Sequence, residues 1–215
     1  MTEDEARRWL ERSFPVSRET WERLERYAAL LLAGMKEQNL IAESTRDHIW
    51  ARHIVDSAQL IPLVPPAAED DLWVDLGAGA GLPGIIVAIL SGYRVMMIEM
   101  RRKRVQFLEQ VIDALGLANA SVFAGKVERA ATSAPRPAAV ISARAYAPME
   151  RLIASALPLA GKNTVWVLPK GQNFQNELDI AQSLWQSDAR VEPSLTAPES
   201  AILVLKNVRK RGGKA

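Results

Sequence analysis

The sequence predicts an α/β fold that has a mostly parallel sheet and a helical appendage at its N-terminus. From Leu72 onward, apolar strand-like segments alternate with helix-like segments, which implies parallel strands with helices on both faces of the sheet. Before that point, apolar side chains recur at helical spacing until a cluster of prolines ends the pattern. We therefore expect a helical appendage over residues 1–66 and an α/β domain over residues 67–215, packed as one unit.

The elements follow in order along the chain. In the appendage, Ser17 is a typical N-cap for a helix with apolar residues from Trp21 to Leu32, and a second helix is expected over 48–61. The α/β domain then alternates strands, expected at 72–76, 94–99, 120–123, 138–142, 164–168 and 201–207, with helices, expected at 83–90, 103–115, 149–157 and 173–185.

Glycines and the last segment add two further expectations. Gly92, Gly116 and Gly161 stand where helix C-caps are expected. The segment 189–208 has two extended stretches without a helix between them. This segment predicts a hairpin that adds an antiparallel edge strand to the sheet.

Composition excludes several kinds of chemistry. The chain has 215 residues, 48% hydrophobic and 24% charged, as expected for a globular protein with a core. It has no cysteine, which excludes disulfides, thiolate-bound metals and cysteine nucleophiles. No apolar run is long enough to span a bilayer, and the acidic N-terminus does not resemble a secretory signal. We expect a monomeric cytoplasmic protein with neither a metal nor a membrane partner.

The basic residues are clustered, although the net charge is only +2. Arg101, Arg102, Lys103 and Arg104 form an unbroken block, and a second cluster near the C-terminus contains Lys206, Arg209, Lys210, Arg211 and Lys214. Such clusters are typical of contact with a polyanion. The alternative for each is a solvated surface.

The segment 73–84 has the pattern of a strand, a tight turn and a helix. Asp75 ends an apolar run, Gly77, Gly79 and Gly81 follow at alternate positions, and Pro83 and Gly84 precede a second apolar run. Glycines allow positive φ and close approach of a ligand, and the following helix offers free N–H groups. The pattern predicts a ligand site at the end of the first strand.

A second acid narrows the choice of ligand. Glu99 ends the second expected strand, 24 positions after Asp75, close to the roughly 20 residues typical of an acid that binds ribose hydroxyls. Residues 79–84 match the dinucleotide fingerprint G-x-G-x-x-G, which alone is weak evidence for NAD. Residues 75–81 instead resemble the first motif of class I S-adenosylmethionine methyltransferases, and this interpretation fits better because Gly77 directly follows the strand end.

Four motifs carry a more specific resemblance. They are Asn39-Leu40 with Arg-His-Ile-Val-Asp-Ser at 52–57, the glycine loop at 75–84 with its Leu-Pro-Gly ending, Lys-Arg-Val-Gln-Phe-Leu at 103–108, and Val-Ile-Ser-Ala-Arg-Ala at 140–145. In this order they resemble the glucose-inhibited division protein B family, the bacterial 16S ribosomal RNA guanine-N7 methyltransferases, over nearly the whole chain. The resemblance implies a class I, Rossmann-like methyltransferase fold and methylation of guanosine 527 in the 530 loop.

The resemblance and the positions of the charged residues together indicate functional residues. The cofactor S-adenosylmethionine is expected to be bound by Asp75, Gly77, Gly79, Gly81, Leu82, Glu99, Val127, Glu128 and Arg144. Arg144, at the end of the fourth strand, is expected to position the target. Contacts to RNA are expected from Arg52, His53, Arg101, Arg102, Lys103, Arg104, Lys170, Arg209, Lys210 and Arg211, with packing between appendage and core as the alternative for Arg52 and His53.

Two positions depart from the family pattern. Ala78 replaces a frequent Thr or Ser, which removes a hydroxyl contact to the cofactor, and Pro169 interrupts the expected Leu-Lys-Gly, which affects the placement of Lys170.

The missing residues agree with guanine N7 as the target. Methylation of pyrimidine ring carbons usually needs a cysteine, and methylation of exocyclic amines usually uses an Asn/Asp-Pro-Pro-aromatic motif, whereas this chain has Ser142 to Ala145 at that place. N7 is a bare acceptor that has no proton to lose, so no general base is required. The partner is expected to be 16S rRNA or a small-subunit assembly. The alternatives are methylation of another substrate, an NAD-binding dehydrogenase and an RNA-binding module without a cofactor.

Overall fold

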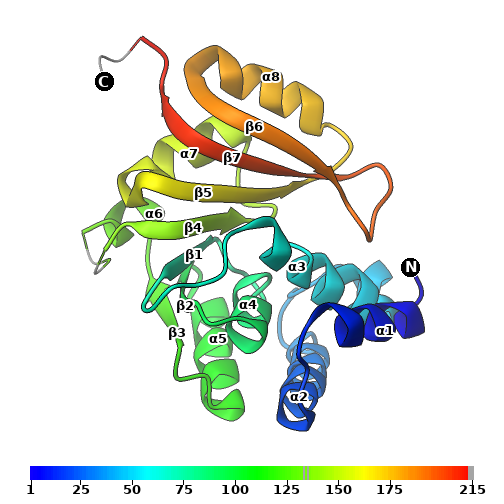
Figure 1. The fold of residues 1–215 in the computed structure, drawn as a ribbon. Helices are drawn as coiled ribbons and strands as arrows, with labels where there is room; N and C mark the ends of the chain where they lie inside the picture. The colour runs from blue at the N-terminus through cyan, green and yellow to red at the C-terminus, as the bar shows by residue number, and fades with distance from the viewer. Residues whose placement is uncertain (133, 135, 213–215) are drawn as a thin grey trace.

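Strands and helices alternate over most of the chain, as the sequence predicts. The structure is a computed structural model that describes residues 1–132, 134 and 136–212. In these residues one sheet has the strand order β3-β2-β1-β4-β5-β7-β6 (Figure 1). The strands are β1 (Leu72–Leu76), β2 (Arg94–Glu99), β3 (Ala120–Ala124), β4 (Ala138–Ala143), β5 (Ala160–Lys170), β6 (Trp185–Pro193) and β7 (Ala201–Lys210).

The helices lie in two layers, one on each face of the sheet (Figure 1). One layer contains α1 (Glu3–Ser13), α2 (Arg18–Gly34), α4 (Gly84–Leu90) and α5 (Arg102–Leu115), and the other contains α6 (Val127–Ala130), α7 (Met149–Ala156) and α8 (Phe174–Leu184). Alternate strand residues face the two layers: Trp73 packs with the first, and Val74 with the second. The first core joins side chains of the appendage, such as Leu24, to those of the sheet, such as Val140. The boundary at residue 66 stays a prediction.

The strands β3, β2, β1, β4 and β5 are parallel to one another, so their carboxyl ends meet at one edge of the sheet. The C-terminal hairpin is antiparallel, as predicted. Within it, β7 pairs with β5, and β6 forms the outer edge. Because β7 runs the other way, its first residue Ala201 lies beside Lys170 at the carboxyl edge, and its last residues lie at the opposite edge.

Several local expectations were wrong. The helix expected over 173–185 ends at Leu184, because Trp185 already begins β6. Of the three expected glycine caps, only Gly116 is left-handed at a helix end, with φ of +59°. Ser91 caps α4 in an extended conformation, which leaves Gly92 beyond it, and Gly161 lies inside β5, where the strand begins earlier than expected.

The segment expected as one helix over 48–61 is instead divided. It contains a 3₁₀ helix η1 (Glu43–His48), a wide π-helical segment η2 (Trp50–Val55), the single turn α3 (Asp56–Ala58) and a 3₁₀ turn η3 (Ile61–Leu63). The physical reason is tertiary. The carboxylate of Glu3 accepts the N–H groups of Trp50 and Ala51 at 3.0 and 2.9 Å, so a distant helix caps the start of the π-helical segment and holds it in place.

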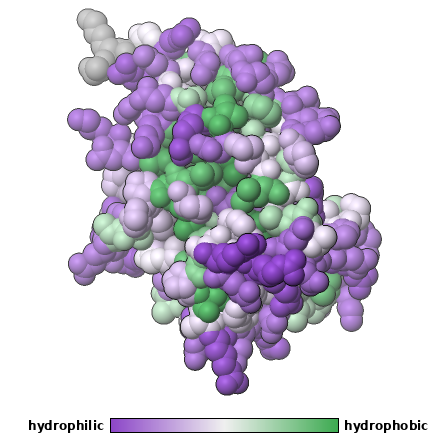
Figure 2. All heavy atoms as spheres, turned by 45° about the vertical axis from the view of Figure 1, so that its right-hand side comes forward, coloured by the Kyte–Doolittle hydropathy of each residue, from purple (hydrophilic) through white to green (hydrophobic). Residues whose placement is uncertain are grey.

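The surface is mostly hydrophilic, with apolar area over the C-terminal part of the sheet (Figure 2). The exposed apolar side chains of that part are Ile180, Leu184, Val191 and Leu195. None of the helices among the described residues is long and apolar enough to cross a membrane. The described residues also contain no group of three or more His, Cys, Asp or Glu side chains arranged to hold a metal ion.

Candidate functional site at the carboxyl edge of the sheet

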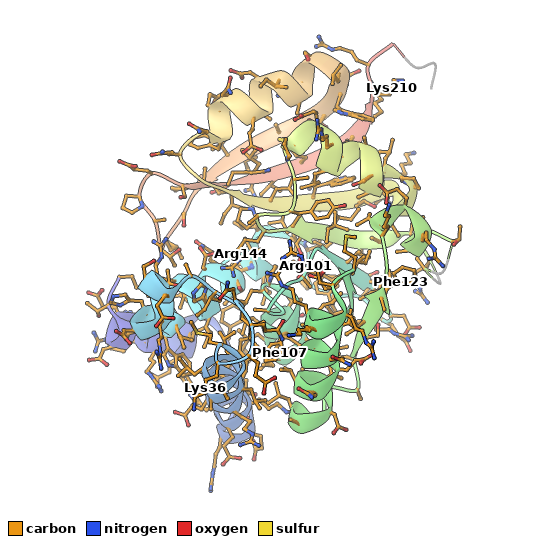
Figure 3. All side chains as sticks on the ribbon, turned by 180° about the vertical axis from the view of Figure 1, so that it is seen from behind. Lys36, Arg101, Phe107, Phe123, Arg144 and Lys210 are labelled. Carbon is orange, nitrogen blue, oxygen red and sulfur yellow. The ribbon has the colours of Figure 1, made fainter. Side chains whose placement is uncertain are left out.

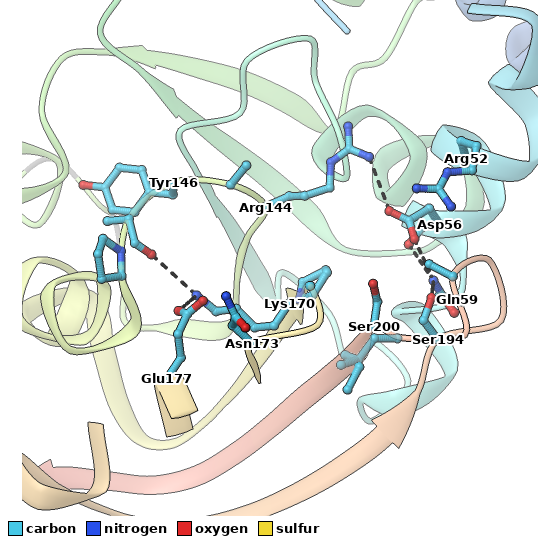
Figure 4. Close-up of a pocket in the computed structure, with 18 of the residues that line it drawn as sticks. Arg52, Asp56, Gln59, Arg144, Tyr146, Lys170, Asn173, Glu177, Ser194 and Ser200 are labelled. Carbon is cyan, nitrogen blue, oxygen red and sulfur yellow. Dashed lines mark hydrogen bonds and ion pairs between the residues drawn. The ribbon is translucent and has the colours of Figure 1, made fainter. Parts of the chain in front are cut away.

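Two neighbouring pockets lie along the carboxyl edge of the sheet. The smaller pocket, about 360 Å³, is lined by Gly77, by residues 98–101 at the end of β2, by Arg104, by residues 125–128 after β3, and by Ala145 and Tyr146. The larger pocket, about 590 Å³, lies between the appendage, the end of β5 and the loop from β6 to β7 (Figure 4). Ala145 and Tyr146 line both pockets.

The glycine loop has the conformation that its sequence predicts. Gly77, Gly79 and Gly81 have φ values of +64°, +59° and +92°, which L-residues with a side chain rarely adopt. The N–H of Ala78 donates to the carbonyl oxygen of Ile98, so the loop is pinned to the end of β2. The loop therefore passes directly from β1 to α4 along one wall of the smaller pocket.

Glu99 is a fixed carboxylate in that wall. Its Oε1 accepts the N–H groups of Met100 and Arg101, both at 2.8 Å, and its Oε2 accepts the N–H of Gly79 at 3.0 Å. The guanidinium of Arg104 lies 3.9 Å away. Glu99 is only 4% exposed, so its carboxylate is oriented by the backbone before any ligand binds.

Asp75 lies beneath the pockets and lines neither. Its carboxyl group is fully buried, and its two oxygens accept the N–H of Gly84 at 3.0 Å and the hydroxyl of Ser142 at 2.9 Å. Burial raises the pKa of Asp75 to about 7, against the lowering effect of these hydrogen bonds. Among the described residues, Asp75 thus connects β1 to β4 and to the start of α4. It stabilises the glycine loop through these hydrogen bonds and not through the pocket surface.

Of the remaining residues expected to bind the cofactor, some line the smaller pocket and others do not. Val127 and Glu128 open α6 directly after β3 and line the smaller pocket. Gly79, Gly81 and Leu82 are not among the described residues that line it; Leu82 is buried in the core.

Arg144 follows the end of β4 and lines the larger pocket (Figure 4). Its Nη1 lies 3.3 Å from Oδ2 of Asp56 and 3.3 Å from Nδ1 of His53. Burial and the nearby charges of Arg144 and Arg52 lower the pKa of His53 to about 3, so its imidazole is neutral and accepts a hydrogen bond from Arg144. The appendage therefore fixes the guanidinium from two sides.

The larger pocket contains two further ordered cations. Lys170 pairs with Glu177 of α8 at 2.7 Å and also lies 3.5 Å from the carbonyl oxygen of Ala147. Arg52 donates to the carbonyl oxygen of Thr196, in the loop between β6 and β7. Lys170 ends β5, and Pro169 before it pairs with β7, so the interrupted Leu-Lys-Gly still brings the ammonium group into the pocket.

The residues expected to bind RNA are only partly brought together. Arg101 and Arg104 line the smaller pocket; of the same block, Arg102 and Lys103 begin α5 and are not among its described lining residues. His53 is buried behind Arg144. Arg209, Lys210 and Arg211 lie at the opposite edge of the sheet, and Figure 3 shows Lys210 far from Arg101 and Arg144. Lys214 lies outside the described residues.

Sequence reasoning missed three residues of the site. Asp56 belongs to the quoted Arg-His-Ile-Val-Asp-Ser motif, and this pattern was the available signal. Gln59 fixes the β6–β7 loop, since its side chain accepts the N–H of Leu195 at 2.8 Å. Tyr146 stands two positions after Arg144, directly beyond the Val-Ile-Ser-Ala-Arg-Ala motif at 140–145.

Comparison with known proteins shows which family the chain resembles. A family model described as "rRNA small subunit methyltransferase G" matches residues 20–202. Proteins with the name "Ribosomal RNA small subunit methyltransferase G" from Zymomonas mobilis and Rhizorhabdus wittichii are 44% and 46% identical, over 100% and 99% of this chain and 98% and 96% of their own. The crystal structure of an rRNA methylase from Streptococcus thermophilus is similar in fold, with a TM-score of 0.52 at 15% identity, over 71% of this chain and 95% of that one.

The fold and the site thus define a class I methyltransferase that uses S-adenosylmethionine, which decides between the two cofactors that the glycine loop left open. The chain belongs to the rRNA small subunit methyltransferase G family, and its activity is methylation of ribosomal RNA. The family that the four motifs indicated is confirmed.

Proposed function

We propose that this protein transfers the methyl group of S-adenosylmethionine to N7 of a guanine in 16S rRNA, guanosine 527 of the 530 loop. The observation that carries the proposal is the ion pairing of both carboxylates among the described residues that line the larger pocket. Asp56 faces Arg144, and Glu177 faces Lys170, so each carboxylate is already ion-paired with a cation of the same pocket.

The cofactor fits the smaller pocket. The buried carboxylate of Glu99 is suited to accept the ribose hydroxyls, and Val127 offers an apolar contact for the adenine. Arg101 and Arg104 supply positive charge for the carboxylate of the methionine part. We assign the sulfonium end to the wall formed by Gly77, whose missing side chain leaves room for the ring of Tyr146.

A pocket whose carboxylates are ion-paired suits guanine N7 as the methylated atom, because this reaction needs no general base. The lone pair of N7 attacks the methyl carbon, and the bond from carbon to sulfur breaks with its electron pair left on sulfur. No proton leaves the guanine, so the protein only needs to align N7 with the methyl group and exclude competing geometry. His53 is also unsuited as a base, since its pKa lies at about 3 and both ring nitrogens have partners among the described residues.

The larger pocket suits a nucleotide. It has room beside the smaller pocket, and Arg52, Arg144 and Lys170 lie around it. Among the described residues both contacts of Arg144 use Nη1, so its Nε and Nη2 remain for a phosphate or for O6 of the guanine. Arg144 is therefore proposed to orient the target.

The test is to map N7-methylguanosine in 16S rRNA from cells with and without this protein. Chain cleavage at N7-methylguanosine locates the modification to one nucleotide. We expect loss of the methyl group at guanosine 527 only. An unchanged modification at that position would contradict the proposal. Purified protein, S-adenosylmethionine and RNA from the deficient cells should restore the modification.

A further inference from the structure

Tyr146 lies at the junction of the two pockets. It is half-buried and, with Ala145, forms part of the wall of both. Among the described residues that line the larger pocket, Tyr146 is the aromatic one; the others are charged, amide or small residues, two prolines and Ile202. Figure 4 shows its ring directed away from the ion pair of Arg144 and Asp56.

The backbone around Tyr146 determines where the ring lies. Ala145 is left-handed, with φ of +52°, and this turn separates the direction of Arg144 from that of Tyr146. A left-handed alanine is strained, and such strain is found mostly at functional sites. On the other side, Lys170 lies within hydrogen-bond reach of the carbonyl oxygen of Ala147, which fixes the chain immediately after the ring.

The ring itself rests on the glycine loop. A Cβ placed on Gly77 would lie only 2.6 Å from Cδ2 of Tyr146 and 3.5 Å from Cγ and Cε2. The contact thus involves the carbon edge of the ring and requires a glycine beneath it. Tyr146 is held against the loop that we assign to the sulfonium end of the cofactor, and it remains part of the pocket assigned to the target nucleotide.

We propose that Tyr146 is the stacking platform for the target guanine, an inference that rests on the proposed function. A base stacked on the ring presents its edge within its own plane, and N7 lies on that edge. The lone pair of N7 is thereby directed along the ring toward the smaller pocket, where the methyl group is carried. Stacking on an aromatic side chain also offsets the loss of stacking in the RNA when the base is displaced.

The experiment compares Tyr146→Phe and Tyr146→Leu with the wild type. Each protein is mixed with saturating S-adenosylmethionine and with unmodified 16S rRNA, both protein and RNA below the Kd of their complex, and the single-turnover rate of N7 methylation is measured. Stacking of ordinary strength predicts a loss of about 5- to 150-fold for Tyr146→Leu. Tyr146→Phe retains the ring and should stay within about twofold of the wild type.

Two readouts separate stacking from a structural role. The affinity for S-adenosylhomocysteine, measured by calorimetry, should change by less than about threefold in both variants. An RNA with 2-aminopurine at the target position should lose fluorescence on binding to the wild type and to Tyr146→Phe, and should keep it with Tyr146→Leu, because quenching reports stacking on the ring.

The outcomes distinguish the two proposals. Equal rates and equal quenching for the wild type and Tyr146→Leu would overturn the platform and leave the proposed function standing. A loss of S-adenosylhomocysteine affinity as large as the loss of rate would also overturn it, since Tyr146 would then serve the cofactor. An absence of N7 methylation by the wild type would overturn the proposed function itself, and the platform with it.

Discussion

The substitution Gly77→Ala tests the glycine loop where the structure is most demanding. Gly77 has φ of +64°, and an added Cβ would meet the ring of Tyr146 at 2.6 Å. The backbone term alone costs about 1 kcal/mol, since a left-handed alanine is strained by 1–2 kcal/mol and the less flexible unfolded chain returns part of this. The collision adds to it, because the ring must shift into one of the two pockets that it lines.

Gly116→Ala is the matched control. Gly116 has nearly the same φ, +59°, and nothing lies within 4 Å of an added Cβ. We expect this control to lower Tm by about 2–4 °C, the effect of ~1 kcal/mol in a chain of this size, and to leave methylation unchanged. Gly77→Ala should lower Tm further and reduce the methylation rate at least about tenfold, the equivalent of ~1.4 kcal/mol.

A double-mutant cycle identifies the collision. Gly77→Ala combined with Tyr146→Ala should be less destabilised than the sum of the single variants, because removal of the ring frees the space that the new Cβ needs. The assays are thermal unfolding, calorimetry with S-adenosylhomocysteine and single-turnover methylation. Additive effects within about 0.5 kcal/mol, or equal behaviour of Gly77→Ala and Gly116→Ala, would refute the reasoning.

Three further predictions concern the surrounding site. Asp56→Asn removes the charge that holds the Arg144 guanidinium. It should reduce the methylation rate about tenfold and leave the affinity for S-adenosylhomocysteine unchanged. Glu22→Gln, which breaks an exposed ion pair with Arg18, is the control. Folding raises the pKa of Asp75 from 3.8 to about 7, so between these pH values the unfolded chain has lost the proton that the folded chain still holds. The free energy of unfolding should therefore fall as pH rises from about 4 to 7. In Asp75→Asn this fall should disappear from the Tm profile between pH 4 and 7, and an identical profile would contradict the assignment. Replacement of Arg209 and Lys210 by alanine should leave the methylation rate within about twofold; a large loss would mean that the RNA also reaches the opposite edge of the sheet.

The elements that depend on local pattern were predictable from the sequence. The bounds of β1 and β2 agree with the expected strands, because each is a short apolar run that ends in a turn or an acid. Ser17 caps α2 as expected, with its hydroxyl oxygen accepting the N–H of Thr20. The extension of β5 to Ala160 and the division of 48–61 were not predictable, since both depend on partners far away in the chain.

Burial explains why some residues expected at the site from the sequence do not line its pockets. Asp75 has the sequence position of a ligand-binding acid, but its carboxyl group is fully buried beneath the loop. Burial also accounts for Ala78, which stands where the family often has Thr or Ser. Its side chain is buried in the core, and Ala78 is not among the described residues that line the smaller pocket. A sequence shows that a residue lies at a strand end, whereas the direction of its side chain depends on how the helices cover the sheet.

We infer that residues 1–66 contribute to the methylation site, and the physical reason lies in the partners of Arg144. Both partners, Asp56 and His53, come from the appendage, and the hydroxyl of Thr196 in the β6–β7 loop donates to Asp56 at 2.6 Å. At the other pocket, the buried hydroxyl of Tyr27 donates to the carbonyl oxygen of Ala80 and holds the glycine loop. A chain without residues 1–66 would leave the guanidinium unpaired and the loop unsupported, so we infer that the methylation site forms only when both parts of the chain are packed together.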